Sequence, residues 1–402
     1  MGREIIHSDL WPSLRITSYY SLEALAECVG FYSQVRVEDF DDMPWLREHV
    51  KATTEQHWTL HAFTPFSSWN DMSSFRITRL TIEVAWGGNK DPVVAILPSL
   101  HHLRALKMTF DNPTEHTSSV LAFAAKSDQL VELELHYDGD EEYVWISDAM
   151  IRNVLEWFQR RPVHTFHIES WDIQAEDTNL KQALFEALFN CPTIEKLVCN
   201  NTLMGGVNFA NCTFSMRSLE ISLLDSTTLK MMANQLIGSN VMDLTVNSRY
   251  DKDIAGIQLL FEILPRTAIE TLNLSYSHYD TPHWQTLAPL LAQSQLKTLI
   301  LQENDLENAE IDIIARAIQS NNSLVAIDVS LNYIDFKGMQ KLIECATDPT
   351  RNAQMKLIAV GGNGISEEDL DLLTELAARR GVEKLKTTNG HDKAEEEYSH
   401  FS

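Results

Sequence analysis

The sequence predicts an α/β solenoid with a concave parallel sheet and convex helices. Three observations predict it: a strand pattern that recurs along the chain, a repeat length that leaves room for a helix, and amphipathic segments between the strands. A single strand and helix cannot bury their apolar faces alone, so such units must stack. The 402 residues, 44% hydrophobic and 22% charged, are sufficient for a large core.

The strand pattern is clearest near the C-terminus. The segments LKTLILQEN from Leu296, LVAIDVSLN from Leu324 and MKLIAVGGN from Met355 each fit L-x-x-L-x-L-x-x-N. Their last residues are Asn304, Asn332 and Asn363. We expect these amides to bond backbone groups left unpaired where the chain turns away from its strand.

The same frame extends backwards to give eleven units. Their middle strand residues are Leu80, Leu106, Leu133, Phe166, Leu197, Leu219, Leu244, Leu272, Leu299, Ile327 and Ile358. The spacing averages about 28 residues, which accommodates a short strand and a helix of about three turns.

The segments between strands carry helix signals. From Ile151, apolar residues recur at i, i+3, i+4 and i+7, with Ser147 as N-cap and Pro162 as the stop. The same spacing begins at Leu229, and Pro282 suits a first helical turn.

This pattern resembles the ribonuclease-inhibitor class of leucine-rich repeat proteins over residues 71–381. The resemblance implies a horseshoe whose strands line the concave side. The resemblance is strongest from Ile269 onward. The terminal Asn is absent from the first eight units.

Two end regions flank the predicted solenoid. Residues 1–70 contain strand-like segments at Ser13, Gln34 and Trp58, which we interpret as atypical N-terminal repeats or a cap; an F-box is the competing interpretation. A helix capped by Ser366 closes the other end at Gly381, and residues 382–402 are expected to be a polar flexible tail.

Charge restricts the partner. A formal net charge of −25 argues against nucleic acid or an anionic membrane and favours a protein with a basic surface. The chain has no apolar run long enough to span a membrane and no signal peptide. Five scattered cysteines without a CxxC pair indicate reduced thiols, and we expect a cytoplasmic protein without cofactor. Because capped ends leave no obvious self-complementary patch, we expect a monomer.

Strand alternation predicts which polar side chains line the concave face. The candidate binding residues are Glu134, His136, His167, Glu169, Glu220, Asp243, Asn273 and Asp328. The candidate aromatic residues at the rim are Trp86 and Trp171. This face is expected to be polar with an acidic middle.

The densest chemistry falls on two neighbouring strands, where equal register sets Glu134 beside His167 and His136 beside Glu169. Two imidazoles and two carboxylates could bind a divalent metal. Because no local spacing such as HExxH supports a metal, we favour a solvated ladder of complementary side chains. No nucleophile or phosphate loop accompanies them, so we assign no catalytic residue and no metal site.

These observations favour a non-enzymatic protein-interaction scaffold that binds a protein or peptide on the concave face. The alternative is a substrate-recognition subunit of a ubiquitin ligase, which requires residues 1–70 to bind an adaptor. A regulator of a small GTPase is third, since Ran GTPase-activating proteins share this repeat type; only Glu395, Glu396 and Glu397 match their acidic C-terminal run.

Overall fold

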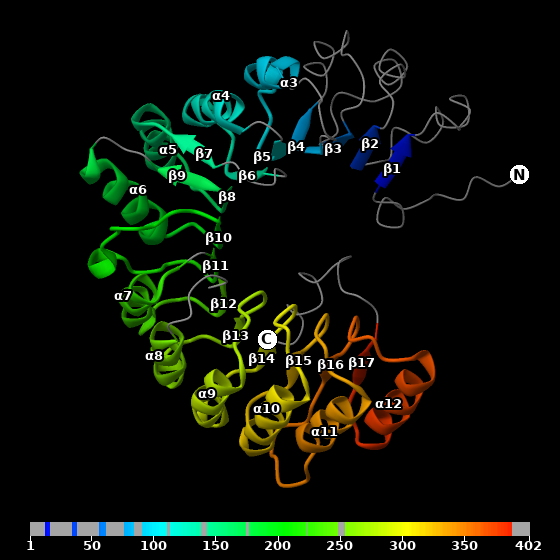
Figure 1. Ribbon diagram of the computed structural model, residues 1–402. Helices are drawn as coiled ribbons and strands as arrows, with labels where there is room; N and C mark the ends of the chain where they lie inside the picture. Colours follow the sequence, from blue (N-terminus) through cyan, green and yellow to red (C-terminus); the bar gives the residue numbers. More distant parts are fainter. Residues whose placement is uncertain are drawn as a thin grey trace, which may run out of the picture. The chain divides into compact units, whose positions relative to one another are not determined.

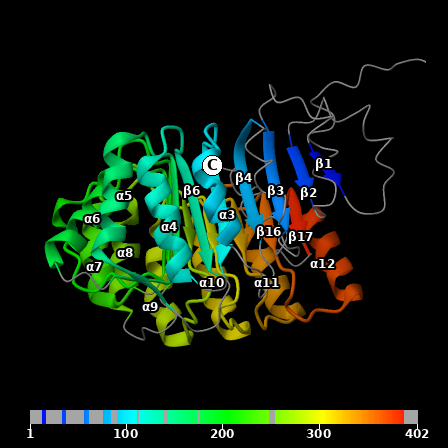
Figure 2. The same cartoon turned by 90° about the horizontal axis from the view of Figure 1, so that it is seen from above.

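The computed structural model describes residues 13–16, 34–37, 56–61, 76–83, 91–110, 113–137, 143–173, 177–222, 224–247 and 254–387. The chain divides into two compact units, Met1–Leu203 and Met204–Ser402. In each unit short parallel strands alternate with helices that lie along one side of the sheet (Figures 1 and 2). The chain is therefore an α/β, leucine-rich-repeat-like solenoid, as predicted.

The first unit places its strands side by side in chain order, each parallel to the next. They are β1 (Ser13–Ile16), β2 (Gln34–Val37), β3 (Gln56–His61), β4 (Ile77–Glu83), β5 (Ala105–Phe110), β6 (Glu132–Tyr137), β8 (Thr165–Glu169) and β10 (Lys196–Asn200). Its helical segments are α3 (Asp91–Ile96), η5 (Leu97–Ser99), α4 (Pro113–Lys126), α5 (Asp148–Arg160) and α6 (Thr178–Asn190). A separate parallel pair, β7 (Val144–Ile146) and β9 (Trp171–Ile173), was not predicted.

The second unit repeats the same alternation. Its strands are β11 (Ser218–Ser222), β12 (Asp243–Asn247), β13 (Thr271–Asn273), β14 (Thr298–Ile300), β15 (Ala326–Asp328), β16 (Leu357–Ala359) and β17 (Lys384–Lys386). Its helical segments are η6 (Phe209–Asn211), α7 (Ser226–Leu236), α8 (Ala255–Ile263), η7 (Leu264–Arg266), α9 (Thr281–Gln293), α10 (Asn308–Ser320), α11 (Phe336–Ala346) and α12 (Glu367–Arg379).

The core lies between each sheet and its helices. All eleven predicted middle strand residues are buried, and successive ones pair in register, as Leu106 does with Leu133 and Leu133 with Phe166. From α5, Ile151 and Val154 are buried beneath the strands, and the indole N–H of Trp157 donates to the Leu130 carbonyl at 2.9 Å. The predicted period therefore identifies the residues that hold sheet and helices together.

The three terminal asparagines form an asparagine ladder (Asn304, Asn332 and Asn363) with the predicted role. Asn332 Oδ1 accepts from the backbone N–H groups of Asn304 and Leu306, in the preceding repeat, at 2.9 and 3.0 Å. Its Nδ2 donates to the carbonyls of Leu301 and Val329. Each buried amide thereby ties one turn to the next, where backbone groups have no strand partner.

The predicted caps are present at both tested helices. Ser147 accepts from the Met150 N–H at the start of α5, and Ser366 accepts from the Asp369 N–H at the start of α12. Gly381 follows α12 with a φ of +82°, a left-handed conformation that glycine adopts without strain. None of the helices in the described ranges is long and apolar enough to cross a bilayer.

The end regions are described only in part. The predicted strands at Ser13, Gln34 and Trp58 are confirmed as β1, β2 and β3, whereas the cap interpretation of residues 1–70 stays a prediction. The boundary at residue 381 was placed too early, because β17 pairs with β16 beyond it. Val382 and Leu385 continue the apolar frame of the ladder, and the rest of the predicted tail, from residue 388, lies outside the described residues.

Candidate binding face

We call the side of each sheet that is turned away from the helices its open face. In the first unit, Leu133 and Leu135 of β6 point into the core, so Glu134 and His136 between and after them point to the open face. On β8, His167 and Glu169 alternate in the same way with buried Phe166 and Ile168. These four residues therefore lie on the open face, as strand alternation predicts, and their part in binding stays a prediction.

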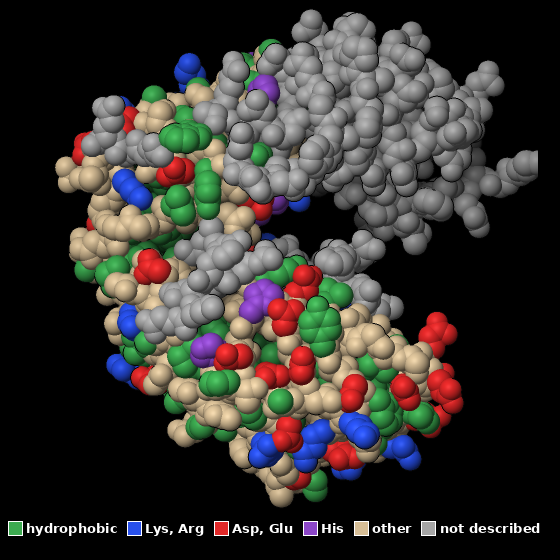
Figure 3. All heavy atoms as spheres, in the orientation of Figure 1, with side chains coloured by type: hydrophobic (Ala, Val, Ile, Leu, Met, Phe, Trp, Pro, Cys, Tyr) green, Lys and Arg blue, Asp and Glu red, His purple; other side chains and the backbone are tan. Residues whose placement is uncertain are grey.

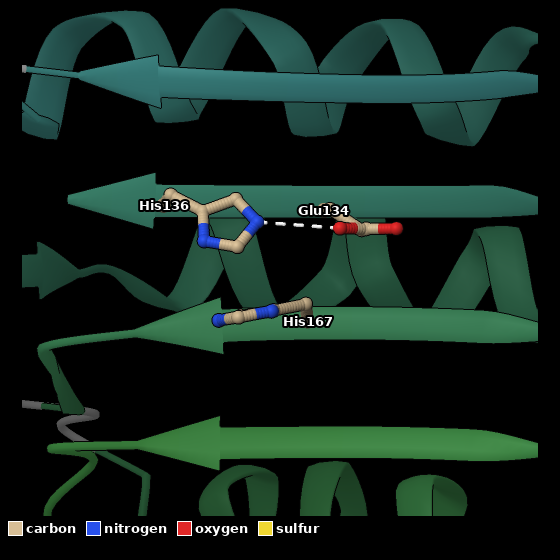
Figure 4. Close-up of side chains that lie close together, drawn as sticks. All are labelled: Glu134, His136 and His167. Carbon is tan, nitrogen blue, oxygen red and sulfur yellow. Dashed lines mark hydrogen bonds and ion pairs between the residues drawn. The ribbon is translucent and has the colours of Figure 1, made fainter. Parts of the chain in front are cut away.

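These side chains contact one another across β6 and β8 (Figure 4). Glu134 pairs in register with His167, and its Oε2 lies 3.2 Å from His136 Nε2. The two imidazole rings are 3.9 Å apart between centroids, and His136 Nδ1 lies 3.8 Å from Glu169 Oε2. We name Glu134, His136, His167 and Glu169 the His–Glu cluster.

Burial and neighbouring charges shift two pKa values in this cluster. The hydrogen bond from His136, aided by the charge of Lys107, lowers the pKa of Glu134 to about 2 against the opposing effect of desolvation. Burial first, and then the charge of His136, lowers the pKa of His167 to about 3. At neutral pH Glu134 is thus anionic and His167 is neutral.

Basic side chains from neighbouring strands face the acidic ones. Arg79 of β4 lies 2.9 Å from Glu132, and Lys107 of β5 lies 3.8 Å from Glu134, with which it pairs in register. The acidic middle that the sequence predicts is therefore matched by cations on this face. On the face shown in Figure 3, acidic and basic side chains also intermix over the second unit.

Two predicted binding residues of the second unit instead use their side chains to bond backbone N–H groups two residues further along the chain. Asn273 Oδ1 accepts from the Ser275 N–H at 2.9 Å, and Asp328 Oδ1 accepts from the Ser330 N–H at 2.8 Å. Asp328 is only 1% exposed and also accepts from the Gln302 amide, so it is not available to a partner. Glu220 and Asp243 are half-buried on β11 and β12, and Asp243 lies 3.6 Å from Arg217.

The expectation of a polar face does not hold for β14 to β16 of the second unit. Ile300, Ala326 and Leu357 occupy open-face positions on β14, β15 and β16 and form a buried apolar cluster. Ala326 pairs in register with Leu357, whereas Ile300 pairs with Asp328 and lies diagonal to Ala326 on the same face. Polar chemistry on the open face is concentrated in the first unit.

The aromatic predictions need one correction. Trp171 is 1% exposed and packs edge-on against Phe166 at 6.0 Å, because it lies in β9 and its side chain turns into the core. Trp86 lies outside the described residues. Among the described residues, the exposed aromatics that sequence reasoning missed are Tyr143, Trp145 on β7, which is 56% exposed, and Tyr333, which is 69% exposed. Val144, Trp145 and Ile146 are all apolar, so the sequence gives no alternation that marks Trp145 as the exposed residue of β7.

One group of side chains within the described ranges could hold a metal ion. Glu134, His136 and His167 each offer one ligand atom, and these atoms lie within 4.8 Å of one another. The described cysteines Cys191, Cys199, Cys212 and Cys345 are all free thiols.

No family model matches the chain, and no curated protein matches it. Among solved structures, the chain is similar to one in the crystal structure of the yeast Rad7 and Elc1 complex, with 14% identity, a TM-score of 0.48 and coverage of 82% of this chain and 80% of that chain. It is also similar to a Bacteroides fragilis protein, with 15% identity, a TM-score of 0.38 and 68% of both chains covered. At these values the similarity does not extend to function.

Proposed function

We propose that this chain is a non-enzymatic scaffold that binds another protein or peptide on the open face of β4, β5, β6, β8 and β10. We also assign its repeats to the ribonuclease-inhibitor class. The repeat of about 28 residues and helices such as the 14-residue α4 and 13-residue α5 support this assignment.

The observation that carries the binding proposal is a set of side-chain rows across these strands. One row runs through Arg79, Ala105, Glu132, Thr165 and Lys196, which pair in register from strand to strand. The next runs through Thr81, Lys107, Glu134, His167 and Val198. At about 4.8 Å per strand, each row spans about 19 Å, which is the length of an extended peptide of about six residues.

These rows are suited to recognition because their backbone is held by hydrogen bonds on both sides and most of their side chains are half-buried. Arg79 is exposed, whereas Ala105 and Val198 are buried. Holding side chains before the partner arrives reduces the entropy lost on binding. The rows alternate in sign, with Arg79 and Lys196 at the ends of one and Glu132 in its middle. This favours a partner of mixed charge over the uniformly basic one expected from the net charge.

The test is a matched pair of blocking substitutions in the tagged full chain, recovered from its native cell with its partners. Thr165→Arg places a long cation within the first row, next to its middle residue Glu132, where the Thr side chain is half-buried. Thr245→Arg makes the same change at a half-buried open-face position of β12 in the second unit. We expect Thr165→Arg to release a partner that the wild type and Thr245→Arg retain.

Retention of every partner by a folded Thr165→Arg chain would contradict this face as the binding site. The alternative, a ubiquitin-ligase subunit, depends on adaptor binding by residues 1–70. Within those residues the structure describes three strands, so this alternative stays a prediction.

A further inference from the structure

The His–Glu cluster brings three side chains with metal-binding atoms to one point of the open face. Glu134 and His136 lie two residues apart on β6, and His167 pairs with Glu134 from β8. Figure 4 shows all three on the same side of the two strands. Their ligand atoms lie within 4.8 Å of one another, and a tetrahedral zinc site requires about 3.4 Å between ligand atoms. Small side-chain rotations close that difference.

We propose that Glu134, His136 and His167 bind a divalent transition-metal ion, with Zn²⁺ as the best match to their chemistry. Two imidazole nitrogens and one carboxylate oxygen form a donor set that zinc takes at three-ligand sites, leaving a fourth position open. This proposal does not depend on whether a protein binds the same face.

An unpaired nitrogen supports a ligand at this point. His167 is only 12% exposed at its side chain, and its Nε2 is buried without a hydrogen-bond partner. The nearest carboxylate oxygen, Glu169 Oε2, is 4.0 Å away, which is too far for a hydrogen bond. Leaving such an atom unpaired costs about 1–3 kcal/mol. A solvated ladder of complementary side chains would satisfy this nitrogen, and the observed arrangement does not.

Glu169 supplies the remaining part of the site. Histidines that bind metals usually donate their other ring N–H to a carboxylate, which fixes the orientation of the ring. Glu169 Oε2 lies 3.8 Å from His136 Nδ1, which is beyond hydrogen-bond distance, and is itself held by the Tyr137 backbone N–H at 3.1 Å. It is the carboxylate that could take this orienting role once the His136 ring turns toward the ion. All four side chains come from strands, whose backbone is held more rigidly than that of loops.

The experiment titrates Zn²⁺ into the purified, chelator-treated full chain in competition with a chromophoric chelator. We expect one Zn²⁺ per chain in the wild type. His167→Ala and Glu134→Gln should each weaken binding at least about tenfold. Co²⁺ added to the wild type should give the visible absorption of a nitrogen- and oxygen-bound ion of low coordination number, a result that needs no variant to fold.

The matched control is His278→Ala in the second unit. His278 Nδ1 lies 2.6 Å from Asp305 Oδ2, so this pair has the same chemistry without a second imidazole. Its loss should leave the zinc affinity unchanged. Equal weakening by His167→Ala and His278→Ala, or wild-type binding weaker than a Kd of about 100 μM, would overturn the proposal. Far-UV circular dichroism confirms that each variant is folded.

Discussion

The two units are built from the same repeat but present different side chains on their open faces. In the second unit, strands such as β13 to β16 are three residues long, the asparagine ladder closes their turns, and the open face of β14 to β16 is buried and largely apolar. In the first unit, strands β5, β6, β8 and β10 are five or six residues long and carry half-buried charged and histidine side chains. The regular repeats stabilise the fold, and the irregular ones carry the candidate chemistry.

In the first unit, which has no asparagine ladder, the Glu169 side chain bonds a backbone group of the preceding repeat. Its carboxylate accepts from the Tyr137 N–H in the preceding repeat, as Asn304 Oδ1 accepts from the Ser277 N–H. An amide satisfies both a donor and an acceptor, whereas a carboxylate satisfies donors only. Glu169 lies two residues before the ladder position, which Trp171 occupies in this repeat, so its carboxylate satisfies a donor of the preceding repeat without donating to a carbonyl.

The largest expected effect tests the ladder in the second unit. Asn332→Ala removes an amide that bonds backbone groups in two successive repeats, and it leaves buried donors and acceptors unpaired. We expect the free energy of unfolding to fall by about 3 kcal/mol, measured by urea denaturation. The control is Asn234→Ala on the exposed side of α7, where alanine is the better helix former and no loss is expected.

A second prediction concerns how acid pH lowers the stability of the first unit. Because the pKa of His167 falls from 6.5 to about 3 in the folded chain, the unfolded chain takes up a proton between these values and the folded chain does not. Stability is therefore unaffected above about pH 6.5 and falls as the pH drops below it. We expect a loss of about 2 kcal/mol between pH 6.5 and 5.

The measurement is the urea midpoint of metal-free protein across that pH range, compared with His167→Gln. The variant should lose most of this dependence. Glu134 contributes in the same direction only at lower pH, as its carboxylate protonates below its unfolded pKa near 4.5. A pH dependence between 6.5 and 5 that is unchanged in the variant would show that another group titrates there.

A third prediction compares two buried tryptophans. Trp157 of the first unit donates to the Leu130 carbonyl, whereas the indole N–H of Trp284 in the second unit is buried without a partner. Phenylalanine removes the N–H from both. We therefore expect Trp157→Phe to cost about 1–2 kcal/mol more than Trp284→Phe in the same urea measurement. Equal losses would show that packing, and not the hydrogen bond, dominates at both sites.

The apolar ladder was predictable because a residue's place in a repeated frame determines its burial. What lies outside that frame was not. The β7–β9 pair joins segments 27 residues apart, Val144↔Trp171, that fit no ladder position, so Trp171 was taken for a surface residue. Asp328 was assigned to the correct face, but its burial depends on the Gln302 side chain of the preceding repeat.

The helix side of the second unit shows the same limit. Asn321 is fully buried, and its side chain bonds the carbonyls of Leu291 and Ser294 in the repeat before. The Arg351 guanidinium donates in turn to the carbonyls of Asn321 and Leu324. Both residues stand between the predicted elements, where sequence spacing carries no signal. Within the His–Glu cluster, strand alternation predicted which residues meet, but the unpaired Nε2 of His167 depends on side-chain rotation.

The smallest effect concerns the ion pairs that cross the first unit's open face. Arg79 and Glu132 lie 2.9 Å apart with side chains 46% and 26% exposed, so water and salt screen their attraction. A double-mutant cycle with Arg79→Ala and Glu132→Ala should give a coupling free energy of about 0.5 kcal/mol that decreases as salt is added. Because the pair is weak, Arg79 and Glu132 can each give up the other and bind a charged group of a partner instead, as the proposed binding on this face requires. A coupling of several kcal/mol would instead make the pair part of the fold, and the rows would then contribute to the stability of the first unit as the asparagine ladder does to the second.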